Sequence, residues 1–313
     1  MLRWLLLSVA LLSTGFARAE PSTHDLDWFD ASRQRAVPVR LYWPEGNKPV
    51  PLVVFSHGIG GSRLGYSYLG QYFASHGMAS LHLQHVGSDR SLWTGNPLSL
   101  VDRLQVAAHE REALERVKDL SFALDRLLAR EEFGRRVDRG RIAAAGHSYG
   151  ANTVLLAVGA SVQREGRQIR LRDPRIKAAV LLSAPPFYGD EDLKAILRSV
   201  TLPTLHVTAT EDVIRIPGFF SPASDRVAVF EAVGSPLKAL AVFEGGSHSI
   251  FTNRGGTGGA ELNPKVKAAT RELALAFLQR VFEGKGEALQ RWPETYRPLL
   301  ARWTSPGTTA AAR

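Results

Sequence analysis

A serine that stands between two glycines is the strongest chemical signal in this sequence of 313 residues. The motif is Gly146-His147-Ser148-Tyr149-Gly150, which follows the apolar residues 142–145 and precedes a helix-compatible run from Ala151. Such a tight turn between a strand and a helix needs small residues on both sides, and it exposes the serine hydroxyl with strained backbone dihedrals. Because the chain contains no cysteine, we expect Ser148 to be the nucleophile of any covalent chemistry.

A serine hydroxyl becomes a good nucleophile only when a base removes its proton, so the motif requires a histidine. His248 meets this need, because it lies in the glycine-rich segment Gly245-Gly246-Ser247-His248-Ser249 after the apolar residues 239–243. The settings of five other histidines favour packing or structural roles: His57, His82, His85, His147 and His206. His82 and His85 lie near the end of one expected strand, but they lack the nearby carboxylate cluster that a metal site would need, so we expect no metal.

An acid must hold the imidazole in one tautomer, and in proteins with such an elbow it lies between the serine and the histidine in the chain. Asp212 satisfies this order in the segment Thr208-Ala209-Thr210-Glu211-Asp212, which follows the apolar residues 204–207. Glu211 satisfies it as well, and the order of residues alone leaves both carboxylates open.

The tetrahedral intermediate of acyl transfer needs backbone N–H groups that stabilise its oxyanion. One conventional donor is the residue after the nucleophile, here Tyr149, and the other lies in a loop after an early strand. Phe55-Ser56-His57-Gly58-Ile59-Gly60-Gly61 follows the apolar residues 51–55, and we expect Ile59 to be the second donor. Elbow, base, acid and oxyanion loop occur together in the required order, which predicts an enzyme.

The segments that must position these residues alternate between strand and helix patterns. The expected strands are residues 37–42, 51–55, 79–83, 142–145, 178–182, 204–207 and 239–243, and the expected helices are residues 66–75, 101–130, 151–160 and 266–282. In the helix over 101–130, apolar residues recur at helical spacing and we expect the charged residues on the opposite face. The alternation predicts an α/β fold with a mostly parallel central sheet, helices on both of its faces, and functional loops at the carboxyl ends of the strands.

Composition supports one globular domain. Hydrophobic residues make up 44% and charged residues 22% of the chain, and no repeat or linker divides residues 20–303. The formal net charge is +9, but the basic residues are spread along the chain, so we expect a solvated basic surface and no nucleic-acid partner. Residues 304–313 are expected to form a disordered tail. Oligomeric state is not predictable from this sequence.

The first nineteen residues have the three parts of a secretory signal peptide. Leu2-Arg3 precedes an apolar run over residues 4–16, and Ala17-Arg18-Ala19 ends it with small residues. We therefore expect cleavage after Ala19 and a periplasmic or extracellular enzyme without stable membrane insertion, an uncleaved anchor being the alternative.

These residues resemble the α/β-hydrolase superfamily, and within it the group that is similar to dienelactone hydrolases and platelet-activating factor acetylhydrolases, over about residues 27–283. Residues 30–39 resemble the opening strand of that group, and residues 55–61 resemble its oxyanion loop, in which the residue matched by Ile59 donates. The segments around Asp212 and His248 are similar to the acid and histidine segments of bacterial cutinase-like polyester hydrolases. The resemblance implies the α/β-hydrolase fold and favours Asp212 over its neighbour.

The chain departs from these families at positions that affect substrate choice. The cutinase-like enzymes use an aromatic oxyanion residue and usually Met or Gln after the serine, where this chain has Ile59 and Tyr149. True dienelactone hydrolases use a cysteine, which this chain lacks.

The sequence therefore predicts a secreted serine hydrolase that needs no cofactor and cleaves small-molecule or lipid-like carboxylic esters. An apolar pocket for the acyl or alcohol group is expected from aromatic and aliphatic residues in loops after strand ends: Trp93, Phe187, Tyr188, Ile214, Phe219 and Phe220. The alternatives are a peptidase, amidase or acyltransferase that uses the same triad, and a non-catalytic secreted binding protein on a hydrolase scaffold.

Overall fold

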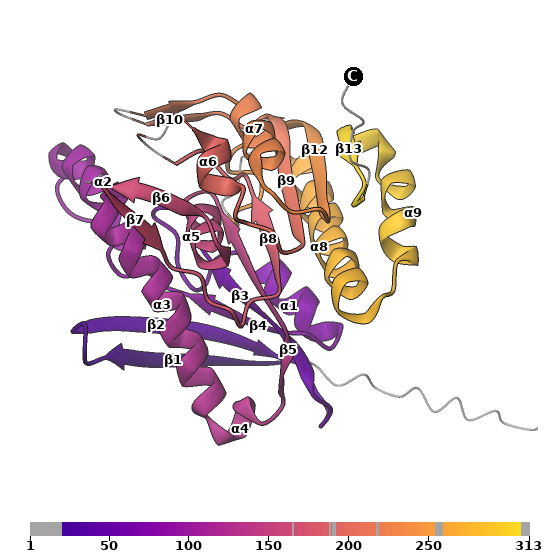
Figure 1. Ribbon diagram of the computed structural model, residues 1–313, viewed down its shortest axis with the longest axis horizontal. Helices are drawn as coiled ribbons and strands as arrows, with labels where there is room; N and C mark the ends of the chain where they lie inside the picture. Colours follow the sequence, from indigo (N-terminus) through magenta and orange to yellow (C-terminus); the bar gives the residue numbers. More distant parts are fainter. Residues whose placement is uncertain are drawn as a thin grey trace, which may run out of the picture.

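The structure is a computed structural model that describes residues 21–164, 166–187, 189, 192–216, 219–253 and 259–307. The predicted signal peptide and residues 308–313 of the predicted tail lie outside these ranges. Within them, one nine-stranded sheet forms the centre of the molecule (Figure 1). Its strands, in spatial order, are β1 (Ser22–Asp30), β2 (Arg35–Trp43), β4 (Ala79–Leu83), β3 (Val50–Ser56), β5 (Val137–His147), β8 (Ala178–Leu182), β9 (Thr204–Glu211), β12 (Lys238–Ser247) and β13 (Leu300–Thr304).

The middle of the sheet is parallel and its edges are antiparallel. Strands β4, β3, β5, β8, β9 and β12 run in one direction, whereas β1 and β2 pair antiparallel at one edge and β13 pairs antiparallel with β12 at the other. The chain leaves β3 toward β4 on one side and later returns to β5 on the other side of β3. The carboxyl ends of β3 and β5 therefore border a topological switch point, where open α/β sheets bind ligands.

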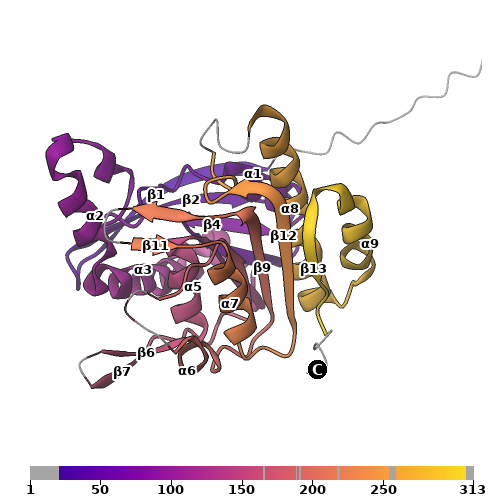
Figure 2. The same ribbon diagram turned by 90° about the horizontal axis from the view of Figure 1, so that it is seen from above.

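Helices cover both faces of the sheet, as the sequence predicts (Figure 2). The helices are α1 (Ser67–Ser75), α2 (Leu100–Ala108), α3 (Glu110–Ala129), α4 (Glu131–Gly134), α5 (Tyr149–Val158), α6 (Leu193–Leu197), α7 (Ser224–Ala232), α8 (Gly259–Glu283) and α9 (Glu287–Thr295), with 3-10 turns η1 (Arg90–Trp93), η2 (Pro97–Ser99) and η3 (Arg297–Leu299). Among the described helices, none is long and apolar enough to cross a membrane.

Two buried apolar clusters lie on opposite sides of the sheet. One contains side chains of α3, α5, α6 and α7, and the other contains side chains of α1, α8 and α9. In β3, Leu52 and Val54 belong to the first cluster, whereas Val53 and Phe55 belong to the second. Because side chains alternate along a strand, a β3 that is apolar throughout must be covered on both faces.

The structure corrects the prediction of one helix over residues 101–130. The backbone of His109 is extended, with ψ of 147°, and separates α2 from α3. The prediction that charges lie on the face away from the core is wrong for part of α3, because Glu112, Arg116 and Asp119 are buried. Their spacing of four and three residues puts them on one helix face, and there they make ion pairs and hydrogen bonds with other elements.

The carboxyl-terminal part contains a strand that the sequence analysis missed. Thr304, the first residue of the predicted tail, is the last residue of β13 and pairs with Leu240 of β12. Trp303 of this strand packs against Trp292 of α9, with ring centroids 5.2 Å apart. Strand β13 therefore ends one residue beyond the domain boundary expected at residue 303.

Candidate active site

Ser148 occupies a strained turn between β5 and α5. Its φ of 54° and ψ of −123° are unusual for a residue with a side chain, and its N–H donates to the carbonyl of Leu182 at 2.9 Å. A Cβ atom on Gly146 would come within 2.3 Å of the Gly150 carbonyl, and one on Gly150 within 2.0 Å of the Ser56 carbonyl. Both glycines are therefore required by close backbone approach, and the expected elbow is present.

Three side chains from three strand ends form a continuous chain of hydrogen bonds. His248 Nε2 lies 2.8 Å from Ser148 Oγ, and His248 Nδ1 lies 2.6 Å from Asp212 Oδ1. The carboxylate can only accept, so Nδ1 carries a proton and Nε2 is free to take one from the serine. Ser148 follows β5, Asp212 follows β9 and His248 follows β12, so the sheet brings together residues that are 36 and 100 positions apart.

Asp212 is completely buried, and its surroundings keep it ionised. Burial raises its pKa, but the hydrogen bond and charge of His248 and the nearby Arg226 guanidinium outweigh this and hold the pKa below its usual range. Thr208 Oγ1 donates to Oδ2 at 2.7 Å, and Arg226 Nε lies 3.4 Å from Oδ1. Glu211, the alternative acid, is the last residue of β9 and its side chain is exposed.

The two expected oxyanion donors lie on either side of the switch point. Tyr149 begins α5, and Ile59 lies in the loop after β3. A Cβ atom on Gly58 would lie 3.3 Å from Ser148 Cβ, so the loop backbone runs directly beside the serine. In the described part of the chain, the N–H groups of Ile59 and Tyr149 donate to no other residue, which leaves both available to a ligand.

His147, expected to have a structural role, lies beneath the base and contacts it. Its Nε2 lies 2.9 Å from the His248 carbonyl oxygen, its Nδ1 lies 2.8 Å from Tyr66 Oη, and the two imidazole centroids are 4.9 Å apart. Burial, followed by the charge of His248, lowers the pKa of His147 to about 3. A neutral His147 therefore donates from Nε2 to the backbone of His248 and accepts from Tyr66 at Nδ1.

Four of the six residues expected to line an apolar pocket lie in η1 and in the hairpin that follows Asp212. Trp93 in η1 is 45% exposed and donates its indole N–H to the Gly60 carbonyl at 2.8 Å, so it rests on the oxyanion loop. Ile214, Phe219 and Phe220 belong to the hairpin of β10 (Ile214–Ile216) and β11 (Phe219–Ser221), which follows Asp212.

Of the remaining two residues of that set, only Phe187 lies in the described part of the chain. Phe187 belongs to the buried core cluster that contains α3 and α5, and Tyr188 lies outside the described residues. Core packing therefore accounts for Phe187.

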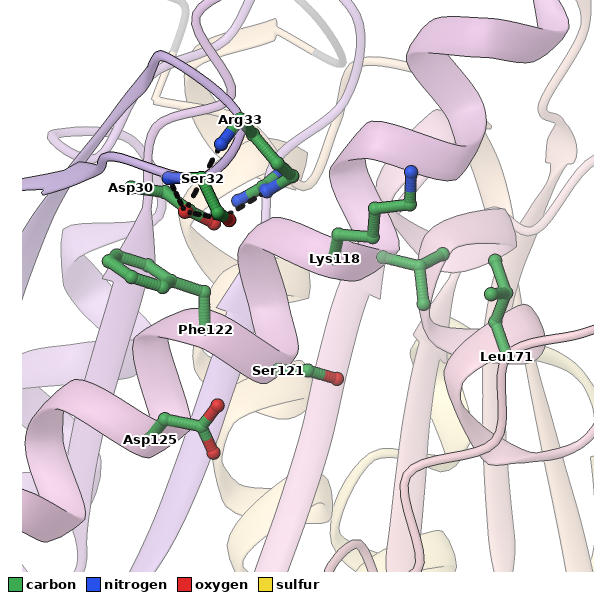
Figure 3. Close-up of a pocket in the computed structure, with 9 residues that line it drawn as sticks. Asp30, Ser32, Arg33, Lys118, Ser121, Phe122, Asp125 and Leu171 are labelled. Carbon is green, nitrogen blue, oxygen red and sulfur yellow. Dashed lines mark hydrogen bonds and ion pairs between the residues drawn. The ribbon is translucent and has the colours of Figure 1, made fainter.

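A separate cavity of about 500 Å³ lies between the turn after β1 and the outer side of α3 (Figure 3). Asp30, Ser32 and Arg33 line one side, and Lys118 and Phe122 of α3 line another. None of the residues expected to take part in chemistry lines this cavity.

The supporting residues around the acid and the base were missed by sequence reasoning. Thr208 precedes Asp212 by four residues in the same segment, and this proximity was a usable signal. Arg226 lies on a helix beyond the hairpin, and no local pattern links it to Asp212.

Comparisons with known proteins found relatives of this chain in sequence and in fold. Residues 34–114 match the family described as platelet-activating factor acetylhydrolase, isoform II. This match covers the expected oxyanion loop but ends before Ser148.

The chain is 26% identical to cutinase est2 of Thermobifida alba, over 66% of this chain and 56% of that protein. It is 24% identical to platelet-activating factor acetylhydrolase of Cavia porcellus, over 56% of this chain and 45% of that protein. The chain thus spans about half the length of these curated relatives. A ferulic acid esterase from Streptomyces cinnamoneus superposes with a TM-score of 0.67 at 23% identity, covering 93% of this chain and 98% of that one.

A mostly parallel sheet with helices on both faces and a serine on a strand-to-helix elbow is the α/β-hydrolase fold. In sequence, the chain is similar to platelet-activating factor acetylhydrolases and cutinases.

Proposed function

We propose that the protein is a serine hydrolase that cleaves carboxylic esters through an acyl-enzyme. The observation that carries the proposal is the hydrogen-bonded chain from Ser148 through His248 to Asp212, with distances of 2.8 and 2.6 Å. A nucleophile, a base and an acid within hydrogen-bond reach of one another are the arrangement that acyl transfer requires.

The reaction follows from this arrangement. His248 Nε2 takes the proton as Ser148 Oγ forms a bond to the ester carbonyl carbon, and the carbonyl oxygen becomes an oxyanion between the N–H groups of Ile59 and Tyr149. The bond to the alcohol oxygen then breaks, and the imidazolium returns its proton to the departing alcohol. Water repeats the sequence on the acyl-enzyme and releases the acid. Asp212 stabilises the imidazolium in both halves.

Esters are the favoured substrate because the cutinase and the acetylhydrolase that the chain resembles are named for ester cleavage. The chain adds exposed aromatic groups at two positions, Trp93 on the oxyanion loop and Phe220 on the hairpin after Asp212. Apolar groups of this kind suit a small-molecule or lipid-like ester.

The first test is hydrolysis of p-nitrophenyl esters from acetate to palmitate by wild type and by Ser148→Ala. We expect activity in wild type and loss of nearly all of it in the variant, because the nucleophile is absent. Ser199→Ala, an exposed serine at the opposite end of the sheet, is the matched control and should retain full activity.

Other outcomes separate the alternatives. Faster cleavage of amides, or acyl transfer to an added alcohol that exceeds hydrolysis, would assign the site to an amidase or an acyltransferase. A wild-type enzyme that neither cleaves these esters nor reacts with a fluorophosphonate would be a binding protein, and equal ester cleavage by Ser148→Ala would show that another residue is the nucleophile.

We also infer that residues 1–19 direct export to the periplasm or the medium, because they have the composition of a cleavable signal. Mass spectrometry of the exported chain should give Glu20 as the first residue. A chain that keeps Met1 and stays in the cytoplasm would contradict this inference.

A further inference from the structure

Arg116 of α3 and Arg226 are the largest fully buried side chains of the described residues, and the Arg116 guanidinium contacts both the loop after β3 and Tyr149 at the start of α5. Nε donates to Thr153 Oγ1 at 3.0 Å, Nη1 donates to Ser88 Oγ at 2.7 Å, and Nη2 donates to Ser56 Oγ at 3.1 Å. Nη2 also donates to the carbonyl oxygen of His57. Every nitrogen of the group therefore has an acceptor.

Two contacts of the Arg116 guanidinium involve the expected oxyanion hole. The His57 carbonyl belongs to the peptide that leads into Gly58 and Ile59, and a hydrogen bond to it fixes the orientation of that peptide plane. On the other side, the Arg116 Cζ atom lies 4.5 Å from the centroid of the Tyr149 ring, a cation–π contact with the residue that supplies the second N–H. One guanidinium thus contacts both halves of the hole.

The loop after β3 is also held by hydrogen bonds of the His57 ring. The ring of His57 donates from Nδ1 to the Gly58 carbonyl at 2.7 Å and accepts the backbone N–H of His85 at Nε2, 3.1 Å away. Burial, followed by the charge of Arg116, lowers the pKa of His57, so this ring stays neutral and keeps both bonds. With the His57 ring and carbonyl both bonded, the backbone beside Ile59 has little freedom to rotate.

The position of Arg116 is itself fixed by surrounding polar groups. Ser88, which accepts from Nη1, donates to Glu112 Oε1 at 3.0 Å, and Glu112 pairs with Arg35 at 2.9 Å. Ser56, which accepts from Nη2, contacts the ring of His85, and that ring contacts Asp119 at 3.0 Å.

This polar network continues outward to the surface. Asp119 pairs with Arg33 at 2.8 Å, and Arg33 lines the cavity beside α3 (Figure 3). The guanidinium at the inner end therefore contacts partners that are themselves held by further ion pairs and hydrogen bonds.

The charge of Arg116 has no direct carboxylate partner among the described residues. Burial lowers its pKa to about 10, which leaves it protonated at neutral pH. A buried cation is costly, and a methionine of similar length would fill the space without a charge. The charges of Glu112 and Asp119 offset part of this cost, and the oxyanion of acyl transfer adds a further negative charge beside Ser148 that the cation can stabilise.

We propose that Arg116 is a positioning residue that preorganises the oxyanion hole, acting through the His57 carbonyl and the Tyr149 side chain. The inference rests on the proposed ester hydrolysis. It assigns Arg116 to stabilisation of the tetrahedral intermediate and not to substrate binding, because the buried guanidinium is separated from the substrate by the loop that it supports.

The test compares Arg116→Met and Arg116→Lys with wild type on p-nitrophenyl acetate. We expect kcat to fall about 100-fold in the Met variant with KM changed less than about threefold, the size of effect seen when one oxyanion donor is lost. The Lys variant keeps the charge but cannot reach all four acceptors, so we expect an intermediate loss of about tenfold.

A second measurement reports on the hole directly. A trifluoromethyl ketone forms a bond from its carbonyl carbon to Ser148 Oγ, the serine proton moves to His248, and the ketone oxygen becomes an oxyanion. The inhibition constant of this ketone should rise in proportion to the loss of kcat/KM across the variants, because both report binding of the oxyanion.

Leu120→Ala is the matched control for a purely structural effect. It removes a fully buried side chain from the same helix without touching the polar network, and it should lower Tm while leaving kcat and the inhibition constant per folded enzyme within about twofold. If the Arg116 variants behave as this control does, the inference is wrong.

If Arg116→Met does not fold, Arg116→Lys tests the inference alone. Unchanged kcat and inhibition constant in a folded Arg116→Lys variant would overturn the inference. An inactive wild type would remove the proposed function and this inference together, whereas an active wild type with unaffected variants would remove this inference alone.

Discussion

Asp212 and Glu211 are neighbours in the chain, yet they lie in opposite environments. Asp212 is buried against His248, Thr208 and Arg226, whereas the Glu211 side chain is exposed. Successive residues at the end of a strand point to opposite faces, so one of the pair must turn away from His248. Residue types alone left this choice open, and the geometry favours Asp212 as the orienting acid.

We predict that Asp212→Asn lowers kcat for ester hydrolysis about 10⁴-fold, because an amide neither stabilises the imidazolium nor fixes the required tautomer. Glu211→Gln is the matched control and should stay within about twofold of wild type. Steady-state kinetics of both variants checks the prediction. A larger loss in Glu211→Gln than in Asp212→Asn would exchange their roles.

A second prediction at the residue scale concerns His147. The ring donates to the His248 carbonyl and packs against the His248 ring, so His147→Gln should let the base shift and lower kcat about tenfold with little change in KM. His82→Gln is the control, because His82 is also a buried histidine but contacts Ser80 and the Gly65 carbonyl. Equal effects of the two substitutions on kcat would show that His147 acts only through stability.

At the scale of elements, the elbow depends on how closely α5 approaches the loop after β3. We predict that Gly150→Ala costs about 3 kcal/mol or more of unfolding free energy, because its methyl group would overlap the Ser56 carbonyl. Gly140→Ala, at an exposed position of β5 where the nearest atom is Asp138 Oδ1 at 3.3 Å, should change stability by less than about 0.5 kcal/mol. Urea unfolding of both variants measures the difference, and equal stabilities would mean that the approach is looser than the structure indicates.

The elements that the sequence predicted well are the central parallel strands. The predicted strands over residues 79–83 and 178–182 coincide with β4 and β8, because strands buried on both faces are continuous apolar runs. The edge strand β1 was missed because its residues are largely polar and exposed, and β13 was missed because the strand is short and partly exposed.

The candidate site residues could be proposed from the sequence without knowledge of the full fold. Glycines mark the elbow and the oxyanion loop, and strand ends mark the base and the segment of the acid, so local patterns were sufficient to propose these positions. The choice of Asp212 over Glu211 needed the family resemblance as well. The supporting residues are different, because Arg116 and Arg226 act on loops that are distant in the sequence. Only the three-dimensional arrangement of α3 and α7 reveals them.

At the scale of the whole molecule, several histidines are buried and neutral, and this makes stability depend on pH. Burial, followed by the charge of Lys238, lowers the pKa of His206 to about 3, and burial lowers the pKa of His82 to about 4. The unfolded chain binds protons at these groups near pH 6.5, whereas the folded chain resists them. Between these pKa values the unfolded state holds more protons, so stability rises with pH.

The stabilising effect of a neutral His206 is therefore fully present above about pH 6.5 and is lost as the pH falls toward 4. We predict that the free energy of unfolding decreases between pH 7 and pH 4, with a contribution on the order of 3 kcal/mol from His206. His206→Gln cannot titrate and should show a shallower decrease, whereas His76→Gln, at an exposed position, should follow wild type. Urea unfolding at a series of pH values measures these slopes. The same slope in wild type and His206→Gln would mean that the His206 ring is accessible to protons in the folded chain, and the pH dependence would then have to come from other groups.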